Sequence, residues 1–132
     1  MRKASSMNDL HGISPGRTAA CLILVELAEA PDRELQTLVD HHATRLGLDE
    51  RDRRLAAALA LAVLRHASYL DLQYRPFLRI APTQLKPPVR ELLRLAAAQR
   101  ILCERIPPHA LVHDTVELGR QVFRLREGEL RF

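Results

Sequence analysis

Apolar residues in the last third of this chain recur every three or four positions, which is the spacing of one helix face. One column of that face consists of Leu111, Thr115, Leu118 and Val122. Pro107 and Pro108 precede it and suit a first helical turn, because a proline there gives up no intrahelical hydrogen bond. Residues 89–103 carry a second helical pattern. The two patterns together predict a helical hairpin with a short, rigid corner.

The same spacing predicts four further helices earlier in the chain. The first is apolar nearly all round, which is typical of a central helix. The second carries a narrower apolar stripe that includes His42. In chain order the four are expected at residues 17–30, at 33–45, from 49 onward and at 68–79.

Residues with special backbone chemistry mark the ends of these helices. Gly47 is expected to stop the second helix, because glycine adopts the left-handed conformation of a helix end. Asp49 is expected to cap the third helix through its carboxylate. Pro76 is expected to disturb the fourth helix, and the prolines of residues 80–88 predict a stiff connector.

Length and composition favour one helical domain. The chain has 132 residues, of which 47% are hydrophobic but only 4% aromatic, and it has no Trp. Leucine and alanine must therefore fill the interior, which predicts an all-α bundle of about six helices. We expect a flexible arm at residues 1–14, the domain at 15–125 and a tail at 126–132. No apolar run is expected to approach the length of a membrane span and no signal peptide is visible, so a soluble, cytoplasmic protein is predicted.

Residues with catalytic or metal-binding chemistry are scattered. His109 and His113 have the spacing of two metal ligands on one helix, but Ala110 stands where a zincin motif has Glu, and no third ligand is in register. No serine lies in a Gly-x-Ser-x-Gly turn, and the five glycines form no phosphate-binding loop. Cys21 and Cys103 are expected to be buried, reduced thiols. We therefore predict no enzyme activity, no metal and no cofactor for this chain.

Two segments carry a family resemblance. The stretch RIPPHALVHDTVELG and the upstream LDERDRRLAAALALAVLRHASYLD are similar to segments of the NusB-like domain and occur in the same order along the chain. That domain occurs as a transcription antitermination factor and as the N-terminal domain of RsmB-type (Sun/Fmu) rRNA cytosine methyltransferases. The resemblance covers about residues 15–123 and is closer to the methyltransferase branch. It implies a NusB-like bundle that binds RNA without a catalytic domain of its own.

The chain departs from the family pattern after Phe123, where the family's closing helix has no counterpart. An apolar groove left open there would favour a homodimer or a partner protein. The basic N-terminal arm of the antitermination branch is also thin, with Arg2, Lys3 and Arg17 only.

Basic residues are concentrated in the middle and C-terminal helices. The net charge is +4, and residues 51–85 hold six basic against two acidic side chains. Arginines four positions apart lie on one helix flank and could follow phosphates. The alternative is a solvated face with local ion pairs, such as Glu117 with Arg120. The candidate RNA-binding residues are Arg17, Arg51, Arg54, Arg65, Arg90, Arg94, Arg120 and Arg124.

Arg65 has two interpretations, since it matches the arginine of the family's Val-Leu-Arg segment. It could bind RNA, or it could tie helix ends together through their free carbonyls, and the structural role is slightly favoured. With so few aromatic residues, backbone or shape recognition is expected in preference to base stacking.

The sequence thus predicts a non-catalytic rRNA-binding module that works beside a catalytic methyltransferase domain. The alternative is an antitermination-type module for protein–protein interaction, pairing with a small ribosomal protein.

Overall fold

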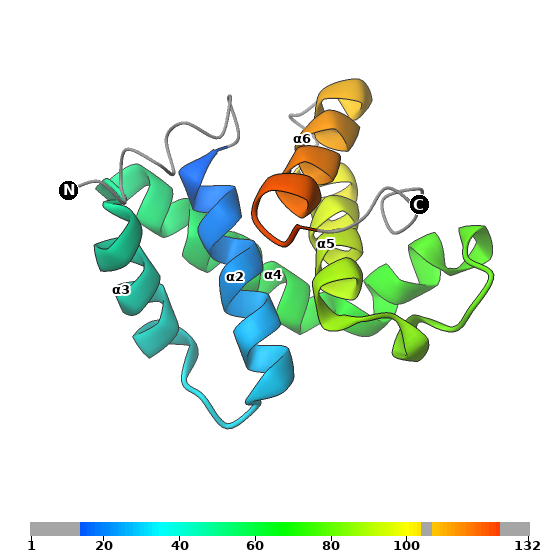
Figure 1. Cartoon of the computed structure of the whole chain (residues 1–132), viewed down its shortest axis with the longest axis horizontal. Coiled ribbons are helices and arrows are strands. Elements are labelled where there is room, and N and C mark those ends of the chain that lie inside the picture. Colours follow the sequence, from blue (N-terminus) through cyan, green and yellow to red (C-terminus); the bar gives the residue numbers. More distant parts are fainter. Residues whose placement is uncertain (1–13, 104–106, 125–132) are drawn as a thin grey trace. The chain divides into compact units, whose positions relative to one another are not determined.

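Helices alone make up the part of the chain that the computed structural model describes, residues 14–103 and 107–124. The prediction of an all-α fold is confirmed. Five α-helices are found in these residues, against about six expected (Figure 1). They are α2 (Pro15–Glu29), α3 (Leu35–Leu46), α4 (Glu50–Tyr74), α5 (Pro87–Ala98) and α6 (Pro108–Gln121). Most of the predicted arm and tail, residues 1–13 and 125–132, lie outside the described residues, so the domain boundaries stay predictions.

The ends of α3 and α4 follow the predicted chemistry. Gly47 closes α3 with φ of 65°, in the left-handed region. The Asp49 carboxylate accepts a hydrogen bond from the Asp52 N–H at 2.8 Å, so Asp49 caps the start of α4. At α2, the Ser14 hydroxyl accepts from the Arg17 N–H at 3.4 Å. Short-range capping therefore fixes where these three helices start or stop.

The two helices expected at 49 onward and at 68–79 form one element, α4. Only His66 inside it has non-helical torsion angles (φ −120°, ψ 20°), which marks a kink. This fusion explains why five helices replace the expected six. Pro76 lies in a 3₁₀ turn, Arg75–Phe77, directly after α4, as its disturbing effect predicted.

The helix expected at 89–103 changes character near its end. Its α-helical part is α5, and a π-helical turn, Gln99–Cys103, continues it. Gln99 is buried there, and its Nε2 donates to the Leu95 carbonyl at 3.2 Å. Helix α6 then begins at Pro108, with Pro107 at its cap, and buries the predicted residues Leu111, Thr115 and Leu118. The predicted second half of the hairpin is confirmed.

The chain divides into two compact units, Met1–Leu61 and Ala62–Phe132, with the division inside α4. In the first unit, α2 and α3 pack together, and Cys21 is buried in α2 as predicted. The backbone of Gly16 approaches α4 so closely that an added Cβ would lie 2.9 Å from the Asp52 carbonyl oxygen. The largest fully buried side chains of this unit include Ile23, Leu24, Leu38 and Val39.

His42 lies in the buried stripe of α3, as predicted, and only 3% of it is exposed. Its Nε2 contacts the Glu26 carboxylate of α2, and Arg45 donates to its Nδ1 at 3.2 Å. A neutral ring with its proton on Nε2 satisfies both contacts. Burial lowers the pKa of His42, although the Glu26 carboxylate acts in the opposite direction.

In the second unit, the end of α4 and the connector pack on α5. Tyr74, Val89 and Leu93 form one buried cluster, and Leu78 and Leu85 pack against it. The connector itself contains a 3₁₀ turn, Pro82–Gln84.

One helical segment among the described residues, Glu50–Phe77, is long and apolar enough to cross a membrane by length and composition alone. The expectation that no apolar run approaches the length of a span is therefore wrong. Leucine, valine and alanine together supply the hydropathy of this run, and between Leu55 and Val63 no charged or polar side chain interrupts it.

Candidate nucleic-acid interface

The first turns of α4 carry two exposed candidate arginines. Arg51 is exposed and has no carboxylate partner among the residues that the structure describes. Arg54 lies 3.6 Å from the Glu50 carboxylate, with 73% of its side chain exposed, so this ion pair is loose and solvated. Their neighbour Arg53 instead binds Asp40 of α3. This part of the first unit therefore presents Arg51 and Arg54 to solvent.

Arg65 lies in the second unit, next to the kink at His66. Its side chain is exposed, and it makes no hydrogen bond to a helix-end carbonyl within residues 14–103 and 107–124. The structural role that the sequence slightly favoured is thus not seen in the described residues. Exposure on α4 leaves the guanidinium available to a polyanion.

Arg94 is held by carboxylates. Its Nε and Nη2 donate to the two oxygens of Asp71 of α4, both at 2.8 Å, and its Nη1 donates to Glu91 at 3.1 Å. Only 20% of its side chain is exposed. Arg90 donates to the same Glu91 carboxylate at 3.0 Å. The predicted column of phosphate-binding side chains on α5 is therefore engaged largely inside the protein.

Tyr74 completes this group, which we call the α4–α5 ion-pair network: Asp71, Tyr74, Arg90, Glu91 and Arg94. The Tyr74 hydroxyl donates to Asp71 at 2.5 Å. Burial alone would raise the pKa of Asp71, but the hydrogen bonds from Arg94 and Tyr74 outweigh it and the pKa is lowered. Burial raises the pKa of Glu91 in spite of both arginines. The two arginines face two carboxylates, so the network adds little net charge to the surface.

The α6 candidates differ from each other. Arg120 forms an ion pair with Glu117, the local pairing that the sequence offered as the alternative. The hydrogen bond from Gln121 is the main cause of the lowered pKa of Glu117, and the charge of Arg120 also contributes. Arg124 follows α6, is exposed and has a φ of 54°. Arg17, at the start of α2, is partly buried.

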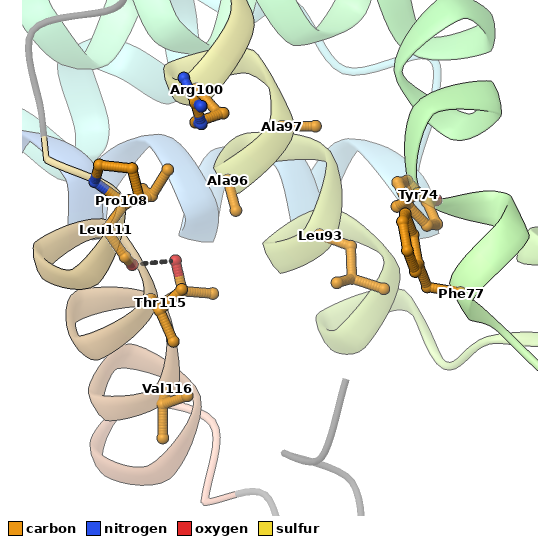
Figure 2. Close-up of a pocket in the computed structure, with 11 residues that line it drawn as sticks. Tyr74, Phe77, Leu93, Ala96, Ala97, Arg100, Pro108, Leu111, Thr115 and Val116 are labelled. Atoms are coloured by element: carbon orange, nitrogen blue, oxygen red, sulfur yellow. Dashed lines mark hydrogen bonds between the residues drawn. The ribbon is translucent and has the colours of Figure 1, made fainter.

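A pocket of about 400 Å³ opens in the second unit between α5, α6 and the end of α4 (Figure 2). We call it the α5–α6 groove. Phe77, which is 85% exposed, and Val112, which is 62% exposed, extend its apolar surface. The groove predicted from the missing closing helix depends on residues after 124, outside the described part of the chain, and stays a prediction. The α6 pattern does not predict the contribution of Phe77 or Arg100, because both come from other segments. Its lining residues are Tyr74, Phe77, Leu93, Ala96, Ala97, Arg100, Pro108, Leu111, Val112, Thr115 and Val116.

Side chains that commonly bind metal ions do not cluster in the described part of the chain. No group of three or more His, Cys, Asp or Glu residues is placed there so that it could hold an ion. His109 and His113 are exposed on α6, and the side chain of Cys103 lies outside the described residues.

The chain is similar to a known protein family and to a curated protein. The model of the NusB family matches residues 14–130. Among curated proteins, the "Probable ribosomal RNA small subunit methyltransferase B" of Bacillus subtilis (strain 168) is 34% identical over 73 residues. This match covers 55% of the chain and 16% of the relative, so the chain matches only a small part of that protein's length. No solved structure matches the chain.

Proposed function

Since this chain belongs to the NusB family, we propose that it is a non-catalytic RNA-binding module that holds ribosomal RNA for a methyltransferase. The observation that carries the proposal is the similarity to a relative named for ribosomal RNA methylation. The exposed arginines described above provide the chemistry that such a role needs. In this proposal the cytoplasm is the compartment, because that is where ribosomal RNA is modified.

RNA contact would come first from arginines whose guanidinium groups face solvent. Arg51, Arg54, Arg65 and Arg124 are exposed, and of these four only Arg54 forms an ion pair with a carboxylate of the described residues. Guanidinium groups bind phosphate oxygens in a bidentate manner. The remaining candidates, Arg17, Arg90, Arg94 and Arg120, would contribute less or only after rearrangement, since they are partly buried or engaged.

Recognition would depend on the RNA backbone and its shape. Arginine–phosphate contacts fix a protein on the RNA but carry no base information by themselves. The chemical step, methyl transfer to a base, would belong to a catalytic methyltransferase domain. A binding module beside a separate catalytic domain agrees with the match to only 16% of the methyltransferase relative.

The direct test is RNA binding as a function of salt. A fragment of small-subunit ribosomal RNA should bind with an affinity that falls steeply as salt rises, because bound phosphates release counterions. Arg51→Ala, Arg54→Ala and Arg65→Ala should each reduce the salt slope by about 0.7 to 0.9, the contribution of one phosphate contact. Arg33→Ala is the matched control, an exposed arginine outside the proposed set. Salt-independent binding, or no binding, contradicts the proposal.

The second candidate is an antitermination-type module that pairs with a small ribosomal protein. The α5–α6 groove favours it, because exposed apolar surface beside Phe77 and Val112 is typical of a protein-binding site. Co-purification of a ribosomal protein, together with salt-independent behaviour toward ribosomal RNA fragments, would support this candidate over the first.

A further inference from the structure

The walls of the α5–α6 groove offer almost no hydrogen-bonding groups to a ligand. Two hydroxyls lie in these walls, and both are engaged within the protein. The Thr115 hydroxyl donates to the Leu111 carbonyl at 2.8 Å (Figure 2). The Tyr74 hydroxyl donates to Asp71 at 2.5 Å. A nucleobase inserted here would leave its own donors and acceptors unpaired, at substantial cost. The groove therefore suits apolar side chains better than it suits RNA bases.

Arg100 is the charged residue of the groove. It is exposed, and within the described residues it has no hydrogen bond or ion pair. Arg90 and Arg94, on the same helical segment, are both bound to carboxylates. Arg100 therefore places a positive charge beside an apolar surface, and no carboxylate of the described residues pairs with it. An acidic group on the occupant would complement it.

The groove is elongated. Figure 2 shows Arg100 and Pro108 on one side of the view and Phe77 on the other, with Ala96 and Leu93 between them. Ala96 and Ala97 of α5 line it with small side chains, which leaves room for side chains of an incoming segment. Its volume of about 400 Å³ falls inside the range of real ligand sites, roughly 300–1,000 Å³.

We propose that the α5–α6 groove docks an amphipathic helix of a partner protein, in which an acidic residue beside the apolar side chains meets Arg100. Helices that bind grooves in this way present apolar residues at i, i+3 or i+4, and i+7. Those residues would lie along the groove from Arg100 to Phe77. The proposal goes beyond RNA binding, because none of the exposed arginines proposed for RNA lines the groove.

The test uses the full chain and a displayed library of helical peptides of about 20 residues, because isolated helices shorter than about 12–15 residues are only marginally stable in water. Apolar residues are fixed at the groove-facing positions, and one neighbouring position is either Glu or Lys. Selection should enrich Glu over Lys at that position. A synthetic copy of the enriched peptide, labelled with fluorescein, then gives the dissociation constant by fluorescence anisotropy.

Reversing the charge at position 100 tests whether Arg100 is the residue that meets the acidic side chain of the peptide. Arg100→Glu should weaken binding of the Glu peptide by about tenfold and improve binding of the matched Lys peptide. Arg79→Glu is the control, because Arg79 is an exposed arginine of the same unit outside the groove, and it should change neither affinity. Both substitutions are at exposed positions, and circular dichroism confirms that each variant folds.

Three outcomes overturn the proposal. The first is no enrichment of Glu, or binding that ignores Arg100→Glu. The second is a groove already filled by a second copy of the chain, seen as a dimer by light scattering that Val112→Glu dissociates. The third is tighter peptide binding after removal of residues 125–132, which would identify the chain's own tail as the occupant. None of these outcomes bears on salt-dependent RNA binding, so the two proposals fail separately.

Discussion

Arg94 of α5 and Asp71 of α4 form a bidentate ion pair, with both nitrogen–oxygen distances at 2.8 Å. The side chains are 20% and 21% exposed, so water screens the pair only partly. Arginine and aspartate are 23 positions apart in the chain, and the pair joins α4 to α5 within the second unit. An arginine that the sequence predicts as an RNA contact can thus be engaged in an ion pair that stabilises the fold.

Asp71→Asn should destabilise the protein by about 2 kcal/mol. The substitution removes the charge that faces Arg94 and leaves a partly buried cation with less compensation, which is costly in proteins. It also weakens the hydrogen bond from Tyr74. Urea unfolding at neutral pH measures the change in free energy. Glu50→Gln, at the exposed pair with Arg54, is the control and should stay within about 0.5 kcal/mol of the parent. An equal effect of the two substitutions would contradict a special role for the Asp71–Arg94 pair.

Gly16→Ala should destabilise the first unit even though alanine is the better helix former. Alanine in a helix normally gains up to about 1 kcal/mol over glycine. At Gly16, however, the new Cβ would lie 2.9 Å from the Asp52 backbone oxygen and 3.1 Å from a Leu55 methyl carbon. Backbone cannot move away as a flexible side chain can, so a net loss of about 1–3 kcal/mol is expected. Thermal unfolding followed by circular dichroism measures it.

Ser68→Ala gives the matched comparison for Gly16→Ala, since Ser68 is exposed on α4. It should change stability little or raise it slightly, through helix propensity alone. If Gly16→Ala proves as stable as the parent protein, α2 and α4 do not approach each other as closely as the structure places them.

Stability should fall as the pH is lowered below about 6.5, because of His42. Burial lowers the pKa of His42 in the folded protein, while the unfolded chain keeps the value of 6.5. Below pH 6.5 the unfolded chain therefore binds more protons, and the free energy of unfolding decreases until the pH passes the lowered pKa. Glu26, Arg45 and His41 are the charged or titratable groups that act on the ring.

His42→Gln isolates this contribution. Glutamine can keep a hydrogen bond to Glu26 but does not titrate, so the variant should lose less stability than the parent between pH 7.5 and pH 5.5. Urea unfolding at the two pH values gives the comparison. A parent and a variant with the same pH dependence would show that His42 does not titrate differently in the two states.

Local chemistry made part of the structure predictable from the sequence. Gly47, Asp49 and Pro108 act through their own backbone or through a hydrogen bond three residues away, so their effects on α3, α4 and α6 do not depend on distant contacts. The Glu117–Arg120 ion pair was foreseen for the same reason, since a separation of three positions places both side chains on one helix flank.

Tertiary contacts account for what the sequence could not supply. The local pattern does not indicate that Arg94 meets Asp71, which lies 23 positions away, while Arg65 faces solvent. The apolar pattern predicts two helices between residues 49 and 79, although no proline or glycine lies between residues 50 and 74 to end a helix; the structure shows one helix with a kink at His66. Which arginines remain for RNA is therefore decided by the packing of α5 on α4.

Glu117→Gln should strengthen RNA binding if Arg120 contributes to it. Glu117 holds Arg120 in a local ion pair, and its lowered pKa keeps it charged at neutral pH. Glutamine removes the negative charge, so Arg120 is drawn less toward α6 and a nearby phosphate is repelled less. The affinity for a ribosomal RNA fragment should rise by about two- to fivefold at low salt. The gain should shrink at high salt, because salt screens both the attraction of Glu117 for Arg120 and its repulsion of a phosphate. Filter binding at two salt concentrations measures this affinity.

Glu34→Gln serves as the control, because Glu34 is an exposed glutamate in the acidic N-terminal part of the chain. An equal gain for this variant would mean that net charge alone, and not Arg120, determines the affinity.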